Sequence, residues 1–222
     1  MNVVTRKLIA KEIHVNRAFV IGATLAGLLS VGVAALGRTG FNVGALTWIT
    51  TIVGLGVMLA IYGVINERKE HSLQFVLSLP IDAGDYVLAK QIGLTICFFV
   101  PWLVASLAAI GLVALKADIP DGMLPYTVLL CIFMLTNFSL VLCGALHATS
   151  EAMMTTTVVI TNMAITLFMF TVGGIPSIQQ HMQGADPVWN GTVSTVLIVE
   201  LGVLAIAFAL PHFIAARRRN FL

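Results

Sequence analysis

The run TGFNVGALTWITTIVGLGVMLAIYGVIN, residues 39–66, contains no Asp, Glu, Lys or Arg between Arg38 and Glu67. A helix rises about 1.5 Å per residue and the hydrocarbon core of a bilayer is about 30 Å thick, so roughly 20 apolar residues can cross it. A helix also satisfies its own main-chain hydrogen bonds in lipid, and the run lacks the polar–apolar alternation of a barrel strand. We therefore expect a membrane-spanning helix over residues 43–65.

Comparable charge-poor runs lie on both sides of this one. The predicted spans are residues 18–36, 43–65, 90–115, 124–148, 153–175 and 192–214. The whole chain is 59% hydrophobic and only 10% charged, whereas a soluble domain is about a quarter charged. The sequence thus predicts a single all-α integral membrane domain over residues 1–222, with six transmembrane helices.

The basic residues predict the orientation of these spans. An even number of spans places both termini on one side, and ten of the twelve Lys and Arg residues fall there. The other side carries Arg38 and Lys116. By the positive-inside rule both termini are expected to be cytoplasmic. We interpret the basic residues as anchors at the lipid surface, and we expect no nucleic-acid partner.

Residues 1–17, MNVVTRKLIAKEIHVNR, precede the first predicted span. Apolar side chains at Val4, Leu8, Ile9 and Ile13 follow an imperfect helical stripe among basic residues. This pattern favours a helix lying along the membrane surface. A frayed tail is the alternative interpretation.

A polar interval, NERKEHSLQFVLSLPIDAGDYVLAK, covers residues 66–90 between the second and third spans. Residues 67–79 contain no Gly or Pro, and Leu73, Val76 and Leu77 recur at helical spacing before Pro80 ends the segment. We expect a short amphipathic helix here, of the kind that docks into a groove on a partner protein. The alternative is a solvated loop.

This interval resembles the loop between the second and third spans of ABC-2 type transporter permeases. The resemblance rests on Glu67-Arg68, on Ser72-Leu73, on the apolar run 75–81 with its Leu79-Pro80, and on Lys90. His71 stands where these permeases often have a Gly. Six spans, cytoplasmic termini and a basic N-terminal helix extend the resemblance over nearly the whole chain.

The resemblance implies a permease subunit that pairs with a second copy of itself or with a related permease. It also implies a separate ABC ATPase subunit, which binds ATP and Mg, in a bacterial or archaeal cytoplasmic membrane. The loop helix would be the coupling helix, and its residues would be Glu67, Arg68, Lys69, Glu70, Ser72, Leu73, Val76, Leu77 and Pro80. Such transporters export hydrophobic or amphipathic compounds, peptides or lipid-linked molecules. This chain has no GxxxxGK[ST] motif, so it is not expected to hydrolyse ATP or hold a cofactor itself.

In such permeases the second and fifth spans tend to line the substrate path. The matching candidates are Trp48, Thr51, Thr155, Asn162 and Thr166. The last three share roughly one helical face, although polar residues in a membrane also serve as hydrogen bonds between helices. Glu200 is a further candidate, because a carboxyl group inside a span costs about 2.5–3.5 kcal/mol on insertion scales. It could contact substrate, carry a proton or make a structural hydrogen bond.

Two other classes of protein remain open. A secondary carrier would use Glu200 as the site of ion or proton coupling and need no ATPase. A membrane enzyme would need clustered catalytic groups, and the spans offer only scattered ones. No metal site is expected, because the pairs His147 with Glu151 and His181 with Met182 supply too few ligands. Cys97, Cys131 and Cys143 have no motif spacing and are interpreted as packing residues.

Overall fold

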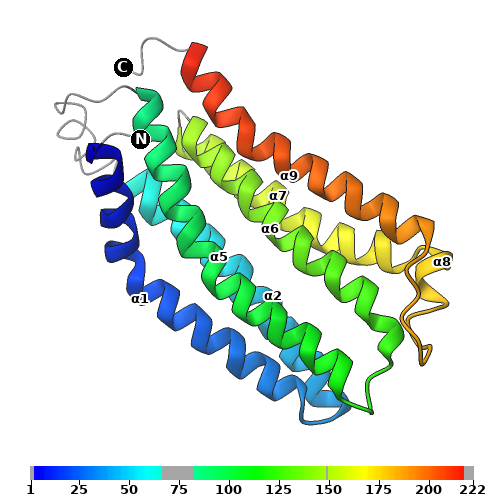
Figure 1. Cartoon of the computed structure of the whole chain (residues 1–222). Coiled ribbons are helices and arrows are strands. Elements are labelled where there is room, and N and C mark those ends of the chain that lie inside the picture. Colours follow the sequence, from blue (N-terminus) through cyan, green and yellow to red (C-terminus); the bar gives the residue numbers. More distant parts are fainter. Residues whose placement is uncertain (1–2, 67–82, 149, 218–222) are drawn as a thin grey trace.

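The computed structural model describes residues 3–66, 83–148 and 150–217, and this part of the chain contains helices and no strand. The long helices are α1 (Val3–Ala34), α2 (Arg38–Ala60), α5 (Ala83–Leu115), α6 (Leu124–His147), α7 (Glu151–Gly173) and α9 (Gly191–Arg217). The short ones are the π-helix η1 (Ile61–Ile65), the 3-10 helix η2 (Asp121–Met123) and α8 (Pro176–Gln179). Figure 1 shows the long helices side by side in one bundle.

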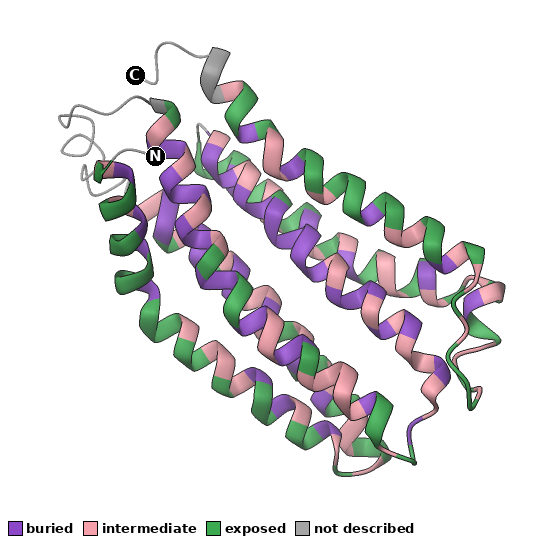
Figure 2. Cartoon of the chain, in the orientation of Figure 1, coloured by how far each residue is buried: buried purple, intermediate pink, exposed green. Residues whose placement is uncertain are grey.

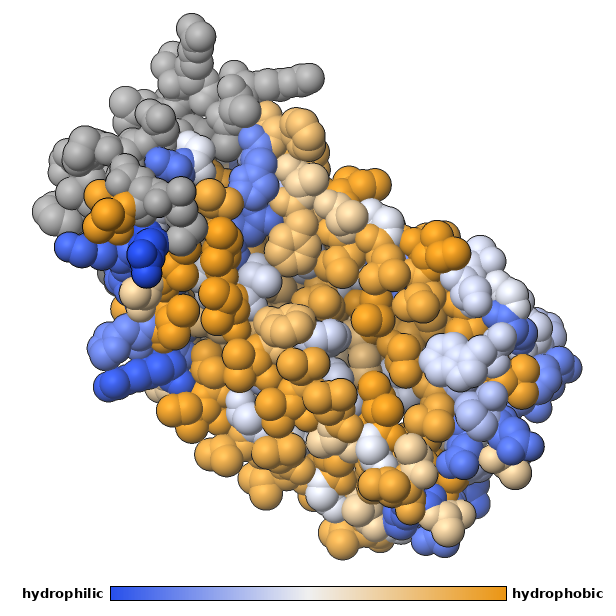
Figure 3. All heavy atoms as spheres, in the orientation of Figure 1, coloured by the Kyte–Doolittle hydropathy of each residue, from blue (hydrophilic) through white to orange (hydrophobic). Residues whose placement is uncertain are grey.

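In the described part of the chain, six helices are long and apolar enough to cross a membrane. They correspond to the six predicted spans, so the prediction of an all-α, multi-pass membrane protein is confirmed. The face drawn in Figure 3 has a broad apolar belt, with polar residues gathered toward both ends of the bundle. The predicted coupling residues, from Glu67 to Pro80, lie outside the described residues.

The separate surface helix predicted over residues 1–17 is not found, because α1 runs without interruption from Val3 to Ala34. No Gly or Pro precedes Gly22 to break it. At about 48 Å, α1 is longer than a hydrocarbon core is thick, and Figure 1 shows that it changes direction along its length. In this part of α1, Ile13 is exposed and Glu12 is buried.

The bundle has two ends, which we name by what they carry. The termini end holds the start of α1 and the end of α9, and the loop end holds η2, α8 and the turn at residues 35–37 (Figure 1). At the loop end, Asn190 caps α9 by accepting a hydrogen bond from the main chain of Val193 (3.0 Å) and donates to the carbonyl of Ser177 (2.6 Å). These bonds join α8 to the start of α9.

Helix α6 is the centre of the bundle. It packs against α2, α5, α7 and α9, while α1 lies along α5 and α2. Figure 2 shows α6 mostly buried, whereas α7 and α9 expose much of their surface. The core between α5 and α6 includes a parallel stack of Phe98 on Phe138, with ring centroids 4.0 Å apart. The indole of Trp102 donates to the carbonyl of Cys131 at 2.8 Å, which satisfies its N–H in an apolar setting.

Helices α1 and α2 approach closely at Gly44. A Cβ atom at this position would lie 2.5 Å from the carbonyl oxygen of Ser30 and 2.6 Å from the Cα of Ala34. Main-chain atoms cannot swing aside as a flexible side chain can, so a larger residue must push the two helices apart. Small residues commonly permit such contacts between membrane helices.

We expect Gly44→Ala to lower the free energy of unfolding by about 1–3 kcal/mol, the usual cost of overpacking. Gly54→Ala is the matched control, because it lies in the same helix and a Cβ there meets no atom within 4 Å. It should be neutral, or stabilising by up to about 1 kcal/mol through helix propensity. Denaturant-induced unfolding in detergent micelles measures both variants. Equal stability of the two would contradict the close approach.

Candidate functional site: the start of α5

Two described helices flank the interval predicted to dock a partner, and they pack against each other. The π-helix η1 ends at Ile65, and α5 begins at Ala83. A Cβ atom at Gly63 of η1 would lie 2.6 Å from the Leu94 side chain of α5, so the absence of a side chain allows this contact. Short π-helical stretches within helices are rare and frequently occur at functional sites. The two helices that flank the interval, η1 and α5, are therefore in direct contact with each other.

A buried ion pair connects α5 to α1 close to the same interval. The ammonium group of Lys90 donates to Glu12 Oε1 at 2.7 Å, and the two side chains are 4% and 6% exposed. Gly93 makes room for the acid, since a Cβ there would lie 2.7 Å from the Cβ of Glu12. The crevice beside the pair, which Leu8 and Tyr86 help to line, is too small for a water molecule. The buried Glu12 carboxylate therefore depends strongly on Lys90 for compensation.

The surroundings of Glu12 add weaker contacts. Lys11, which is half exposed, places its Nζ atom 3.9 Å from the same carboxylate oxygen. Asn16 is buried and donates to the main-chain carbonyl of Glu12 at 2.9 Å. Thr5, Ile9, Glu12 and Asn16 thus form the buried face of this part of α1. These residues recur at helical spacing in the sequence. Three of the four are polar, however, and a polar helix face is usually exposed to solvent.

The next residue along α5 connects it to the last helix. Gln91 donates through Nε2 to the carbonyl of Phe208 in α9 at 2.8 Å. Phe208 lies in α9, three residues before Pro211. Adjacent residues of α5 thereby bind α1 on one side and α9 on the other. We call Glu12, Gly63, Lys90, Gln91 and Phe208 the α5 entry cluster.

Glu200, in contrast, is a buried acid without a charged or polar partner in the described part of the chain. The residue is 5% exposed, and neither of its carboxylate oxygens accepts or donates a hydrogen bond there. It lies in α9, which packs against α6 and α5. A buried carboxyl group in this state is costly unless it is protonated or meets a ligand.

The structure does not bring the predicted path residues together. Trp48 lines an apolar chamber at the loop end, and none of the other five lines it. Thr51 donates to the carbonyl of Thr47 in its own helix at 2.7 Å. The remaining candidates lie on α7, and Glu200 is in α9.

Most of the predicted polar face of α7 points away from the bundle. Thr155 and Thr166 are exposed, and Asn162 is half buried with an unpartnered Oδ1. The opposite face carries the contacts: Gly144 of α6 lies directly against the Thr157 side chain. The buried residues of α7 are Met154, Thr161, Ile165 and Val172. Within the described residues, Thr155 and Thr166 do not hydrogen-bond to another helix.

Other candidate ligands are scattered. No three His, Cys, Asp or Glu side chains meet in a metal-binding arrangement among the residues described. His181 places Nδ1 3.0 Å from the carbonyl of Ser177, and His147 places Nδ1 2.8 Å from that of Cys143. These contacts link each imidazole to its own stretch of chain.

No family model, no curated protein and no solved structure matches this chain.

Substitution of Glu200 tests whether its carboxyl group stabilises the fold. Replacing it with Met, which has a similar length and no unmet hydrogen-bonding group, should raise the free energy of unfolding by about 1–3 kcal/mol. Glu200→Gln is the control, because the amide is equally unpartnered and should change stability little. Thermal unfolding in the same detergent compares the two variants. A loss of stability in Glu200→Met would show that the carboxyl group has a structural partner.

Proposed function

We propose that this chain is the membrane-spanning permease subunit of an ATP-driven exporter of the ABC-2 type. A separate ABC ATPase would bind ATP and Mg and dock against residues 67–79. A second permease copy, identical or related, would complete the path for a hydrophobic or amphipathic compound, a peptide or a lipid-linked molecule.

The arrangement of the α5 entry cluster is the observation that supports this proposal most. Lys90 and Gln91 lie about two turns after α5 begins at Ala83, at roughly 1.5 Å per residue. A push on the docking segment would reach α5 first. The Lys90–Glu12 ion pair would then pass it to α1, and the Gln91–Phe208 hydrogen bond would pass it to α9. A permease driven by a partner needs such a connection between loop and spans.

The exposed polar face of α7 supports a second copy. Thr155 and Thr166 face away from their own bundle, and polar side chains in a membrane prefer another helix or a wet cavity to lipid. A second copy placed against α7 would provide either. The path between two copies would then be lined partly by this face.

The orientation can be checked by labelling. Cysteines placed at Asp118 and Asp186 should react with a membrane-impermeant maleimide added outside intact cells, because both lie in loops on the side poor in Lys and Arg. Cysteines at Glu70 and Arg219 should react only after the cells are opened. Labelling at position 70 from outside would reverse the orientation and remove the docking segment from any cytoplasmic ATPase.

The proposal itself is tested by assembly and transport. The chain is co-expressed with the product of the neighbouring reading frame, purified through a tag on the permease, and reconstituted into liposomes, and we expect that product to be an ABC ATPase. We expect the ATPase to co-purify and its hydrolysis rate to change at least about tenfold upon assembly. ATP should then drive movement of a lipophilic dye. Purification without an ATPase, combined with dye movement driven by a proton gradient alone, would overturn the proposal.

That second outcome would favour a secondary carrier, and one observation keeps this candidate open. Glu200 is buried without a described partner, as a residue that takes up and releases a proton would be between binding events. Glu200→Gln discriminates the two functions. It should abolish gradient-driven movement in a carrier, whereas ATP-driven transport in an exporter does not require a titrating group.

A further inference from the structure

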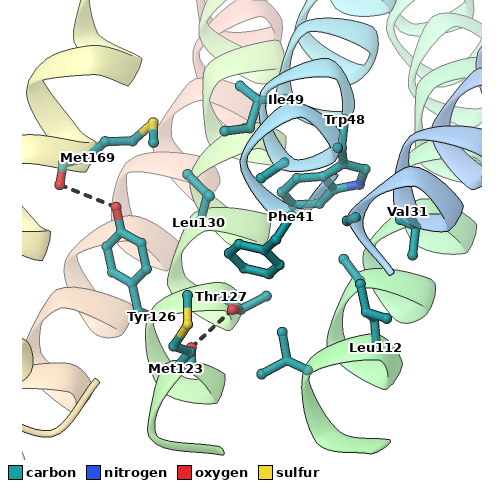
Figure 4. Close-up of a pocket in the computed structure, with 15 residues that line it drawn as sticks. Val31, Phe41, Trp48, Ile49, Leu112, Met123, Tyr126, Thr127, Leu130 and Met169 are labelled. Atoms are coloured by element: carbon teal, nitrogen blue, oxygen red, sulfur yellow. Dashed lines mark hydrogen bonds between the residues drawn. The ribbon is translucent and has the colours of Figure 1, made fainter. Parts of the chain in front are cut away.

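An apolar chamber lies between five helices at the loop end of the bundle. It has a volume of about 190 Å³. Each of α1, α2, α5, α6 and α7 contributes to its wall, for example through Val31, Trp48, Leu112, Leu130 and Met169 (Figure 4). The chamber is partly open to the outside of the bundle, and partly open apolar pockets of this kind are where small apolar molecules bind.

The few polar groups in the wall leave little for water to bind. Thr127 donates to the carbonyl of Met123 at 3.0 Å, and Tyr126 donates to that of Met169 at 3.2 Å (Figure 4). Trp48 is the exception, because its indole N–H is buried and unpartnered in the described part of the chain. In Figure 4 the nitrogen lies on the side of the ring toward Val31. Cavities with such walls remain dry and accept apolar molecules.

The size of the chamber limits its occupant. A cavity of about 150 Å³ in another protein holds benzene, so this one, at about 190 Å³, accommodates an alkyl segment of roughly six to eight carbons. Drug-sized ligands usually occupy about 300–1,000 Å³. The volume of the chamber therefore matches one alkyl chain.

A second, more polar cavity adjoins the chamber. We call it the mouth; its volume is about 360 Å³, and it shares Ala34, Phe41 and Met123 with the chamber. Arg38 and Lys116 also line it. These are the two basic residues that the sequence places on this side of the membrane.

The two cations of the mouth differ in the hydrogen bonds and ion pairs that they make. Lys116 donates to the carbonyl of Ala35 at 2.5 Å, and its Nζ lies 3.9 Å from Asp118. Arg38 is exposed and makes no hydrogen bond or ion pair with the described residues. With one acid against two bases, the mouth carries a net charge of about +1. This charge balances a monoanion, and a guanidinium group binds carboxylates through two parallel hydrogen bonds.

We propose that the chamber and its mouth bind one medium-chain carboxylate, with the alkyl chain among the five helices and the carboxylate at Arg38. The single-chain volume, the apolar wall and the cationic mouth each favour this ligand. The site lies within one copy of the chain and requires neither an ATPase nor a transport cycle, so it does not depend on the proposed function.

Binding can be measured on the purified chain in phosphatidylcholine nanodiscs, without ATP or ATPase. The probe is 10-bromodecanoate, because bromine quenches the fluorescence of a nearby tryptophan and Trp48 is in the chamber wall. The Trp48→Phe chain defines the signal from the other tryptophans. We expect saturable quenching of Trp48 by the carboxylate, and at least about tenfold weaker binding of 10-bromodecanol. Equal affinity for acid and alcohol, or quenching that never saturates, would overturn the assignment.

Variants then test each part of the site. Ala109→Leu fills the chamber from α5 and should weaken binding at least about tenfold, whereas Ala114→Leu, on an exposed face of the same helix, should have no effect. Ala45→Leu fills the chamber from α2, if the first variant does not fold. Arg38→Gln should reduce carboxylate affinity to that of the alcohol. Arg17→Gln, at an exposed arginine of α1 that does not line the mouth, should not.

A phospholipid arm completes the test. Brominated phosphatidylglycerol in the nanodisc should leave Trp48 fluorescence unchanged and should not compete with the fatty acid. Quenching by this lipid together with exclusion of 10-bromodecanoate would assign the site to a membrane phospholipid and overturn the proposal. Unchanged fatty-acid affinity in both chamber-filling variants would do the same.

Discussion

Lys90→Met should lower the free energy of unfolding by about 3–5 kcal/mol, because it leaves the Glu12 carboxylate buried without its closest cation. The two groups are 2.7 Å apart, both nearly inaccessible to solvent, and the adjoining crevice cannot hold water. The value should fall toward the lower end of this range, since Lys11 lies 3.9 Å from the same oxygen. Unfolding by denaturant in detergent micelles measures the change.

Two further variants separate the ion pair from its surroundings. Lys11→Met removes an exposed cation from the same carboxylate and should cost less than about 1 kcal/mol. Glu12→Gln combined with Lys90→Met removes both charges and should recover most of the stability lost in the single variant. A double variant as unstable as Lys90→Met alone would show that the two residues act independently.

The double variant also has a functional use. If the pair only stabilises the bundle, the recovered protein should couple ATP hydrolysis to transport normally. If it carries motion from the docking segment to α1, as we propose, the same protein should fold and bind its ATPase yet transport poorly. Stability and transport thus report on different roles of the same contact.

The spans could be predicted from the sequence because lipid imposes a simple requirement. Charges are excluded from the hydrocarbon, so intervals such as that between Arg38 and Glu67 define the helices almost by themselves. The bounds of α2 with η1, Arg38–Ile65, contain the predicted span 43–65. The first helix was the exception. Its Glu12 looked like a surface residue, and only the position of Lys90 explains why it is buried.

The candidate site could not be predicted in this way. Glu12 and Lys90 are 78 positions apart in the chain, and no local pattern indicates which acid meets which base. Gly63 and Gly93 looked like ordinary glycines of apolar helices, although their missing side chains allow the contacts around Leu94 and Glu12. The position of Glu200 inside a span could be predicted from the sequence, but the absence of a described partner depends on how α9 packs. Local sequence predicts the helices, and their packing determines the site.

Simultaneous replacement of Leu73 and Leu77 by Asp should release the ATPase during purification, or leave it bound with hydrolysis no longer coupled to transport. The reason lies in the sequence pattern, since these two leucines and Val76 form the predicted apolar face of residues 67–79. Loss of a buried anchor at an interface typically costs about 2 kcal/mol or more, and a carboxylate in its place adds the cost of desolvating a charge.

The control for this variant is Lys69→Ala, in the charged start of the same segment. A charge at the rim of an interface mainly affects the association rate, so this variant should retain the ATPase and its coupling. Pull-down through the permease tag gives the amount of bound ATPase, and proteoliposomes give the ratio of molecules moved to ATP hydrolysed. We expect the described helices to remain folded in the double Asp variant, because both changes lie between η1 and α5. Full retention of binding and coupling in the double Asp variant would therefore refute the docking role of residues 67–79, and the ATPase would have to contact another part of the chain.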